Sequence, residues 1–197
     1  MTLQDDAVLK LFQSLGAYLR GHFRLTSGLH SPEYLQCALV LQYPEHAEAL
    51  GKTLAGKVLP LLGDRKPELV AAPALGGLMI GHEVARALGA RFIFTERDSE
   101  AKMVLRRGFS IAPGEAAVVI EDVVTTGGST REVVQALRAA GAEVLAAGSL
   151  IDRSGGAASV GVTRAALATL KAVAWPPEDC PLCREGLPVT KPGSRPA

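Results

Sequence analysis

The sequence predicts an α/β fold in which a central parallel sheet is covered by helices on both faces. Short apolar runs alternate with longer, helix-like segments along most of the chain, and this alternation is typical of parallel strands joined by crossover helices. The run 69–72 holds no polar residue, as expected of a strand that is buried on both faces. With 197 residues and 48% hydrophobic content, the chain can bury the core of one such domain.

Helices are expected at 8–19, 44–61, 77–88, 131–140 and 163–170. Pro44 suits the first turn of the second helix, and Gly63 lies beyond its end. Gly89 directly follows the third helix and suits its C-terminal cap.

Strands are expected at 69–72, 91–95, 109–111, 116–121, 144–150 and 171–175. The charged segment 96–102 is expected to form a loop, after which 109–111 returns to the sheet. Because ligands bind beyond the carboxyl ends of parallel strands, residues at three strand ends should converge on one rim of the sheet. These are Ala72-Pro73, Glu121-Asp122 and Asp152-Arg153.

Composition and missing motifs disfavour several classes of protein. A net charge of +1 gives no sign of a nucleic-acid surface, and three cysteines make no disulfide framework. The first six residues are acidic where a secretory signal is basic, and no apolar run is long enough to span a bilayer. A cytoplasmic protein without membrane or nucleic-acid partners is therefore expected. The absence of G-x-x-x-x-G-K-[ST] and of G-x-G-x-x-G after a strand disfavours nucleotide triphosphatases and dinucleotide-dependent oxidoreductases.

A phosphate-binding turn is predicted directly after the strand 116–121. This strand ends in Glu121 and Asp122, and the glycine- and hydroxyl-rich turn 125–130 leads at once into a helix. The free N–H groups and the dipole of a helix start suit a phosphate. Carboxylates just before it suit sugar hydroxyls or a hydrated Mg²⁺. Together they predict a pocket for a phosphorylated sugar.

A simpler interpretation of this segment is a flexible turn followed by a helix cap. Ser129 or Thr130 would then be the N-cap, with Glu132 in the first helical turn. Against it, two like charges at the end of a buried strand are costly for structure alone. A ligand or cation that shares the site explains them better.

The segment 118–130 resembles the phosphoribosyl pyrophosphate motif of the type I phosphoribosyltransferases. Over roughly residues 5 to 175 the chain resembles the orotate phosphoribosyltransferases within that family. Three further segments carry this likeness, namely the N-terminal signature 23–34, the pyrophosphate-side loop 72–77 and the element 151–153 with its orotate-binding arginine. The resemblance implies one domain at 1–175, with a small hood formed largely by residues 1–40 and the C-terminal part, and a separate tail at 176–197.

The implied reaction is transfer of ribose 5-phosphate from phosphoribosyl pyrophosphate to N1 of orotate, with release of pyrophosphate, in pyrimidine (UMP) biosynthesis. The implied cofactor is Mg²⁺, bound mainly through substrate oxygens and water rather than by a set of protein ligands. A transition state with oxocarbenium character at C1 of the ribose requires preorganised charge and exclusion of water.

The resemblance also implies roles for individual residues. Lys102 and Asp122 are the implied catalytic residues, and substrate-binding roles fall on Glu121, Thr125, Thr126, Gly127, Gly128, Ser129, Thr130, Arg153, Arg97, Ala74 and Gly76. The amides of 126–130 would hold the 5-phosphate, the two carboxylates the ribose hydroxyls, and Thr125 and Arg153 the orotate. The segment 97–102 matches the family's mobile loop, which closes over the neighbouring subunit's site, so a homodimer is implied. Without that context, Lys102 is an ordinary solvated loop lysine.

Three positions depart from the pattern of better-known orotate enzymes. Thr26 and Gly76 stand where many relatives carry lysine, and the loop after Lys102 lacks the usual Asp-His-Gly. Arg106 and Arg107 are candidates to supply the missing charge, or are a pair of surface arginines.

The tail carries a Cys-x-x-Cys pair, Cys180 and Cys183. Such a pair is half of a zinc site, whose other half would come from Cys37, a histidine or a second subunit. The alternative is two partly buried thiols in a turn, or a redox-labile pair. His30 is expected to make a local turn contact, and the other histidines show no metal-like spacing. The final residues 191–196 are expected to be extended or disordered, or to lie over the neighbouring subunit.

Two other functions fit the same motif. One is a phosphoribosyltransferase for another base, because base choice lies in the hood and in Arg153. The other is a regulatory protein that binds phosphoribosyl pyrophosphate without turning it over, which the missing lysines favour.

Overall fold

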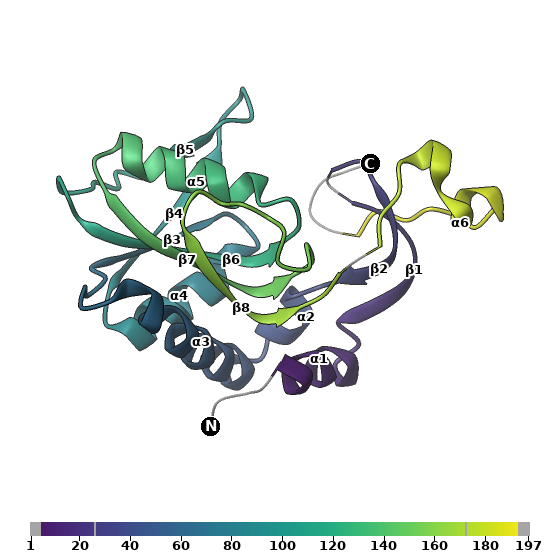
Figure 1. Ribbon diagram of the computed structural model, residues 1–197, viewed down its shortest axis with the longest axis horizontal. Helices are drawn as coiled ribbons and strands as arrows, with labels where there is room; N and C mark the ends of the chain where they lie inside the picture. The colour runs from purple at the N-terminus through teal and green to yellow at the C-terminus, as the bar shows by residue number, and fades with distance from the viewer. Residues whose placement is uncertain (1–4, 26, 172, 193–197) are drawn as a thin grey trace.

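The computed structural model describes residues 5–25, 27–171 and 173–192, and its centre is a six-stranded sheet (Figure 1). From one edge to the other, the strands are β5 (Met103–Leu105), β4 (Arg91–Arg97), β3 (Leu69–Pro73), β6 (Ala116–Val124), β7 (Glu143–Asp152) and β8 (Thr163–Thr169). All neighbouring strands are parallel except β4 and β5, which are antiparallel. The predicted fold class is confirmed.

Helices cover both faces of this sheet (Figure 1). On one face lie α1 (Asp5–Ser14), α3 (Pro44–Val58) and α4 (Gly77–Leu88), and on the other lies α5 (Gly128–Ala139). Side chains alternate along β6, so Ile120 packs in the cluster under α3 and α4, whereas Val119 packs against Val133 and Leu137 of α5. Because both faces are buried, the carboxyl ends of β3, β6 and β7 are held at one fixed rim.

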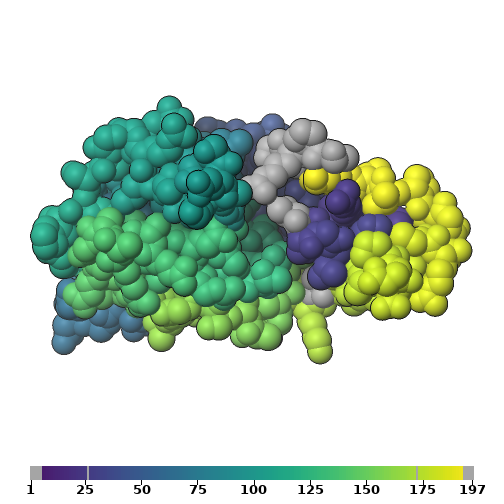
Figure 2. Space-filling model, turned by 90° about the horizontal axis from the view of Figure 1, so that it is seen from above, coloured from purple at the N-terminus to yellow at the C-terminus, as the bar shows by residue number. Residues whose placement is uncertain are grey.

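An antiparallel hairpin of β1 (Tyr18–Arg24) and β2 (His30–Leu35) forms a second, smaller sheet. The C-terminal tail lies along it, since Trp175 exchanges two backbone hydrogen bonds of 2.8 Å with His30. Figure 2 shows the purple hairpin and the yellow tail side by side at one end of the molecule, away from the teal and green segments of the large sheet. The described residues also contain four short helical turns: α2 (Ala38–Leu41), η1 (Leu59–Leu62), η2 (Pro177–Asp179) and α6 (Pro181–Arg184).

The first helix is shorter than the predicted 8–19. Gly16 adopts φ +63°, and the N–H of Ala17 bonds to Phe12 O at 2.8 Å, which closes the helix in a left-handed cap. Tyr18 and Leu19 belong to β1 instead. The second helix begins at Pro44 as predicted, and its final turn is the 3₁₀ helix η1.

The segment predicted as a helix at 163–170 is the strand β8. Its alanines favour a helix by local propensity, but the segment pairs with β7 along its length. Leu167 and Ala168 are fully buried in the core cluster under α1 and α3. Burial at the sheet edge therefore overrides the local preference.

Two other strand predictions are wrong in position. The strand that returns beside β4 is β5, not 109–111, and β4 extends to Arg97 into the predicted loop. The segment 171–175 is not a strand in its described part, because Lys171 and Trp175 each make one isolated bridge. The helices at 77–88 and 131–140 and the strands at 69–72, 91–95, 116–121 and 144–150 are confirmed. Thr26 and residues 193–197 lie outside the described residues.

Candidate active site

The predicted anion-binding turn lies at the end of β6, where the chain passes into α5. Gly127 adopts φ +76°, and a Cβ there would lie 2.9 Å from a Val160 methyl, so both conformation and space require glycine. The first helical hydrogen bond runs from the Arg131 N–H to Gly127 O at 2.9 Å. The N–H groups of residues 128–130 therefore precede the helical ladder, an arrangement that suits an anion.

The two adjacent carboxylates point to opposite sides, as successive residues of a strand must. Glu121 is buried, and its Oε2 accepts a hydrogen bond of 3.0 Å from Thr130 Oγ1. Burial, with the neighbouring charge of Asp122, raises the pKa of Glu121 well above its ordinary value. Asp122 accepts a hydrogen bond of 2.8 Å from the Val123 N–H, and burial raises the pKa of Asp122 as well.

Asp122 lines a cavity of about 690 Å³ between the rim of the large sheet, the hairpin and the tail. Of the predicted site residues, Gly76, Asp122 and Ser129 meet in its wall. The hairpin and the following residue 36 add Arg24, Tyr34 and Gln36, and the tail adds Lys191 and Pro192. The cavity thus combines one carboxylate and a helix start with two cationic side chains.

Gly76 and Asp122 approach each other closely. A Cβ built on Gly76 would lie 2.6 Å from Asp122 Oδ2 and 2.8 Å from its Oδ1. Gly76 has φ −57° and ψ −40°, so any residue could adopt its backbone and only space demands glycine. A lysine at this position is incompatible with Asp122 as it lies here. Ala74, on the same loop, donates its N–H to Thr95 O at 2.8 Å.

Arg153 follows β7 and reaches the hairpin instead of the cavity. Its guanidinium is buried and donates 3.0 Å hydrogen bonds to Ser31 Oγ and to Glu33 O. Burial lowers the pKa of Arg153, and the charge of Glu33 opposes that shift. The residue therefore joins the sheet rim to the N-terminal signature. Thr125 and Thr126 lie exposed in the turn before α5.

Lys102 and Arg97 lie on the β4–β5 hairpin, and neither is among the residues that line the cavity. Lys102 is 71% exposed, and its Nζ lies 2.6 Å from Glu100 Oε2. Asp98 Oδ1 orders the turn by accepting 2.9 Å hydrogen bonds from the N–H groups of Glu100 and Lys102. Arg97 pairs with Glu132 of α5 at 2.7 Å.

Of the two arginines after this hairpin, Arg107 has a structural partner. Its guanidinium forms two hydrogen bonds of 2.7 Å to the carboxylate of Glu96, which lowers the pKa of Glu96. This contact favours the interpretation of Arg107 as a surface residue.

The sequence patterns assign no site role to Arg24, Gln36 or Lys191, although all three line the cavity. The first two lie in or beside the N-terminal signature 23–34, which is the signal that could have identified them. Lys191 lies in the predicted arm. The tail brings it to the cavity by pairing with β1, through the 2.8 Å hydrogen bond from the Arg24 N–H to Thr190 O.

Across residues 5–25, 27–171 and 173–192, no helix has both the length and the apolar character needed to cross a membrane.

Comparisons with known proteins agree with this geometry. Residues 41–162 match the family model described as "Phosphoribosyl transferase domain". The chain is 53% identical over 190 residues to the orotate phosphoribosyltransferase of Pelotomaculum thermopropionicum, covering 96% of this chain and 97% of that one. It is 51% identical over 193 residues to that of Heliobacterium modesticaldum, covering 98% and 100%. The crystal structure of orotate phosphoribosyltransferase from Aeropyrum pernix matches with a TM-score of 0.67 and 27% identity, over 83% of this chain and 94% of that one.

Proposed function

Because this chain belongs to the phosphoribosyltransferase family, and within it to the orotate phosphoribosyltransferases, we propose that it transfers ribose 5-phosphate from phosphoribosyl pyrophosphate to orotate. The products are orotidine 5′-monophosphate and pyrophosphate, and the reaction belongs to de novo pyrimidine biosynthesis. The observation that carries this function is that Asp122 and Ser129 of the sugar-phosphate motif line the same cavity as Arg24 and Tyr34 of the hairpin.

The 5-phosphate binds at the start of α5 in this proposal. The N–H groups that precede the helical ladder at 128–130 donate to its oxygens, and the helix dipole favours its charge. Ser129, which lines the cavity, adds a hydroxyl donor. The hydrogen bond between Thr130 and Glu121 keeps this turn rigid, so the amides need no reorganisation when the phosphate arrives.

Asp122 holds the ribose hydroxyls and favours positive charge on the sugar ring. Burial raises the pKa of its carboxyl, and a cation that approaches Asp122 favours the ionised form, which stabilises positive charge on the sugar. Glu121 lies on the opposite side of β6 and acts through Thr130, which positions the phosphate turn. In this proposal Asp122 contacts the sugar directly, whereas Glu121 positions the phosphate-binding turn through Thr130.

The Mg²⁺ that phosphoribosyltransferases use fits the oxygen donors present. Asp122 offers a hard carboxylate oxygen at the cavity wall, and the remaining ligands come from substrate oxygens and water, as is usual for Mg²⁺. When bound, the ion neutralises charge on the pyrophosphate that leaves.

Arg24 and Lys191 supply positive charge for the two anionic substrates. The resemblance places family lysines at Thr26 and Gly76, where this chain has none. Both cationic side chains line the cavity and thus can take over part of that role. The roles of Arg153 and Thr125 towards orotate rest on the resemblance alone, because neither residue lines the cavity. The contact of Arg153 with Ser31 and the backbone of Glu33 sets the distance between rim and hairpin.

Lys102 reaches the pyrophosphate from the neighbouring subunit of a homodimer, as the resemblance implies. Lys102 lies in the exposed turn that joins β4 to β5, away from the buried core. This position suits a side chain that acts outside its own subunit's cavity. The enzyme is proposed to work in the cytoplasm, as the composition suggests.

An orotate absorbance assay tests the function. The purified chain, given phosphoribosyl pyrophosphate and Mg²⁺, is expected to consume orotate and to release pyrophosphate in equal amount. Adenine, hypoxanthine and uracil serve as competing bases. Turnover of one of these in preference to orotate, or binding of phosphoribosyl pyrophosphate without turnover of any base, would contradict the proposal.

A further inference from the structure

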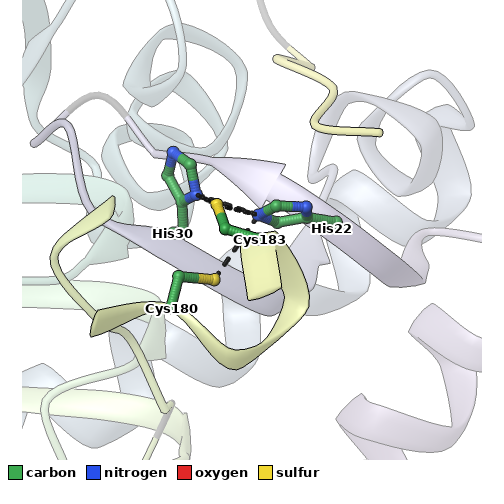
Figure 3. Close-up of side chains that lie close together, drawn as sticks. All are labelled: His22, His30, Cys180 and Cys183. Atoms are coloured by element: carbon green, nitrogen blue, oxygen red, sulfur yellow. Dashed lines mark hydrogen bonds between the residues drawn. The ribbon is translucent and has the colours of Figure 1, made fainter. Parts of the chain in front are cut away.

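Four side chains from opposite ends of the sequence meet where the tail crosses the hairpin (Figure 3). His22 comes from β1 and His30 from β2, whereas Cys180 precedes α6 and Cys183 lies within it. Their ligand atoms all lie within 4.8 Å of one another. No other group of three or more histidine, cysteine or acidic side chains in the described chain is arranged in this way. We propose that these four residues bind one structural Zn²⁺ ion, which fastens the tail to the hairpin.

The spacing of the four atoms suits tetrahedral zinc. With Zn–S near 2.3 Å and Zn–N near 2.0 Å, a sulfur and a nitrogen lie about 3.5 Å apart, and two nitrogens about 3.3 Å. His22 Nε2 lies 3.5 Å from Cys180 Sγ and 3.6 Å from Cys183 Sγ, and His30 Nδ1 lies 3.2 Å from Cys183 Sγ. The two ring nitrogens are 2.8 Å apart, so binding of the ion requires them to separate by about 0.5 Å.

The tautomer of His22 also suits a metal ligand. Its Nδ1 lies 2.8 Å from the carbonyl oxygen of Leu187. Because a carbonyl can only accept, Nδ1 must carry the proton, and in the neutral ring Nε2 then presents a lone pair to the other three atoms. A backbone carbonyl that holds the second nitrogen of a ligating histidine is a common feature of zinc sites.

The donor set and its burial identify the class of site. Two thiolates and two neutral imidazoles neutralise the charge of one Zn²⁺ and match its preferred ligands. His22 is 4%, His30 6% and Cys180 0% exposed, whereas Cys183 is exposed. Four protein ligands complete a tetrahedral coordination sphere and leave no open position for substrate. The site is therefore structural and separate from the catalytic cavity.

Besides its backbone hydrogen bonds to the hairpin, the tail has almost no apolar core to hold it in place. From 176 to 192, Cys180 alone is buried, and two large apolar residues of the tail are open, with Leu187 46% and Val189 47% exposed. A segment with so small a core requires a covalent or metal cross-link to keep one conformation. The Cys-x-x-Cys turn supplies it: the Arg184 N–H bonds to Cys180 O at 3.3 Å, and Gly186, at φ +72°, donates its N–H to Cys183 O at 3.0 Å.

The ion has a consequence for the cavity, and this step rests on the proposed function. The backbone of the zinc ligand His22 is itself bonded to the tail, through the 2.9 Å hydrogen bond from the Thr190 N–H to His22 O. The next residue, Lys191, lines the cavity. Fixing the tail at the metal therefore fixes a cationic side chain beside the substrates.

Metal analysis of the full chain, purified under reducing conditions, tests the site directly. About one zinc per chain is expected. Cys180→Ser and Cys183→Ser should each lose the zinc, whereas Cys37→Ala and His82→Gln should retain it, because Cys37 lies in the core and His82 on the surface. In wild-type protein reconstituted with Co²⁺, the absorption spectrum should show thiolate-to-metal charge transfer and the intense bands of a tetrahedral ion.

Metal content is independent of orotate turnover, so failure of this proposal is distinguishable from failure of the proposed function. The zinc site would be disproved by wild-type protein that holds no zinc and takes none up under reducing conditions. A disulfide between Cys180 and Cys183 in freshly isolated protein, or zinc retained by the double serine variant, would also overturn it. A rise in the Km for phosphoribosyl pyrophosphate is expected in the Cys183→Ser variant, and an unchanged or lowered Km would refute the link between the ion and Lys191.

Discussion

Thr130 Oγ1 donates a 3.0 Å hydrogen bond to Glu121 Oε2, and this bond ties the first turn of α5 to the strand that carries Asp122. Both partners are buried. The helix start that is proposed to hold the phosphate and the carboxylate that is proposed to hold the ribose are thereby fixed relative to each other. This single hydrogen bond sets the geometry of the proposed sugar-phosphate site.

Loss of this hydrogen bond should destabilise the fold. Thr130→Val keeps the shape but leaves a buried carboxylate oxygen without its donor, so the free energy of unfolding should fall by about 1–3 kcal/mol. Thr53→Val is the matched control, since the buried Thr53 hydroxyl bonds to Ala49 O within its own helix. Urea unfolding measures both. Equal losses in the two variants would show that the carboxylate has no special dependence on Thr130.

The raised pKa of Glu121 predicts a pH dependence of stability. Because burial raises this pKa in the folded state, the folded protein binds the proton more tightly than the unfolded chain. Ionisation of Glu121 therefore lowers the free energy of unfolding as the pH rises from its ordinary pKa of 4.5 towards the raised value. Glu121→Gln removes this effect, so the variant should gain stability relative to wild type with rising pH. Urea unfolding of wild type and Glu121→Gln at several pH values between about pH 5 and pH 8 tests this expectation. The same dependence of the free energy of unfolding on pH in both proteins would contradict it.

The contact between Gly76 and Asp122 predicts a steric effect on substrate binding. A methyl group at Gly76 would lie 2.6 Å from the carboxylate and must displace it, so Gly76→Ala should raise the Km for phosphoribosyl pyrophosphate by about tenfold. The backbone there is helical and tolerates alanine.

Gly56→Ala is the control for this experiment. Gly56 lies in α3 with no atom within 4 Å of the added methyl group. The substitution should stabilise the helix by about 0.5–1 kcal/mol and leave the kinetics unchanged. If Gly76→Ala has wild-type kinetics as well, Asp122 does not hold the ribose in the observed position.

Local patterns were sufficient to predict the elements that surround the sugar-phosphate site. The strands β3 and β6 are apolar up to Pro73 and Ile120 because both faces are buried, and Gly127 in the turn that follows is required by φ and by space. By contrast, β8 was predicted as a helix because its alanines favour one locally, and only pairing with β7 reveals the strand.

The features that were missed depend on contacts between distant parts of the chain. Cys183 meets His30 across a separation of 153 residues, and no spacing rule for zinc ligands spans such a distance. Lys191 enters the cavity only because the tail returns along β1. Both features depend on the tail lying along the hairpin. Neither the sequence of the tail nor that of the hairpin predicts this pairing.

Lys102 is predicted to act in the neighbouring subunit. Lys102→Ala should lower kcat by about 100-fold with little effect on orotate binding, and Asp122→Asn should impair use of phosphoribosyl pyrophosphate while the fold stays intact. In mixed dimers of these two variants, one of the two sites has both residues intact if the loop crosses the interface. Random mixing makes half the dimers mixed, so about a quarter of wild-type activity should return. No recovery on mixing would place Lys102 in its own subunit's site or outside the mechanism.

Lys191 is predicted to strengthen substrate binding from the tail. It lines the same cavity as Asp122 and Arg24, and phosphoribosyl pyrophosphate is highly anionic, so Lys191→Ala should raise its Km by about tenfold. Because the charge acts on bound substrate and transition state alike, kcat should change little. Lys66→Ala is the control, since Lys66 is exposed just before β3, at the opposite end of the sheet. The Km of wild type should also rise with salt more steeply than that of the Lys191 variant. An unchanged Km in Lys191→Ala, or an equal change in Lys66→Ala, would remove the tail from the substrate site.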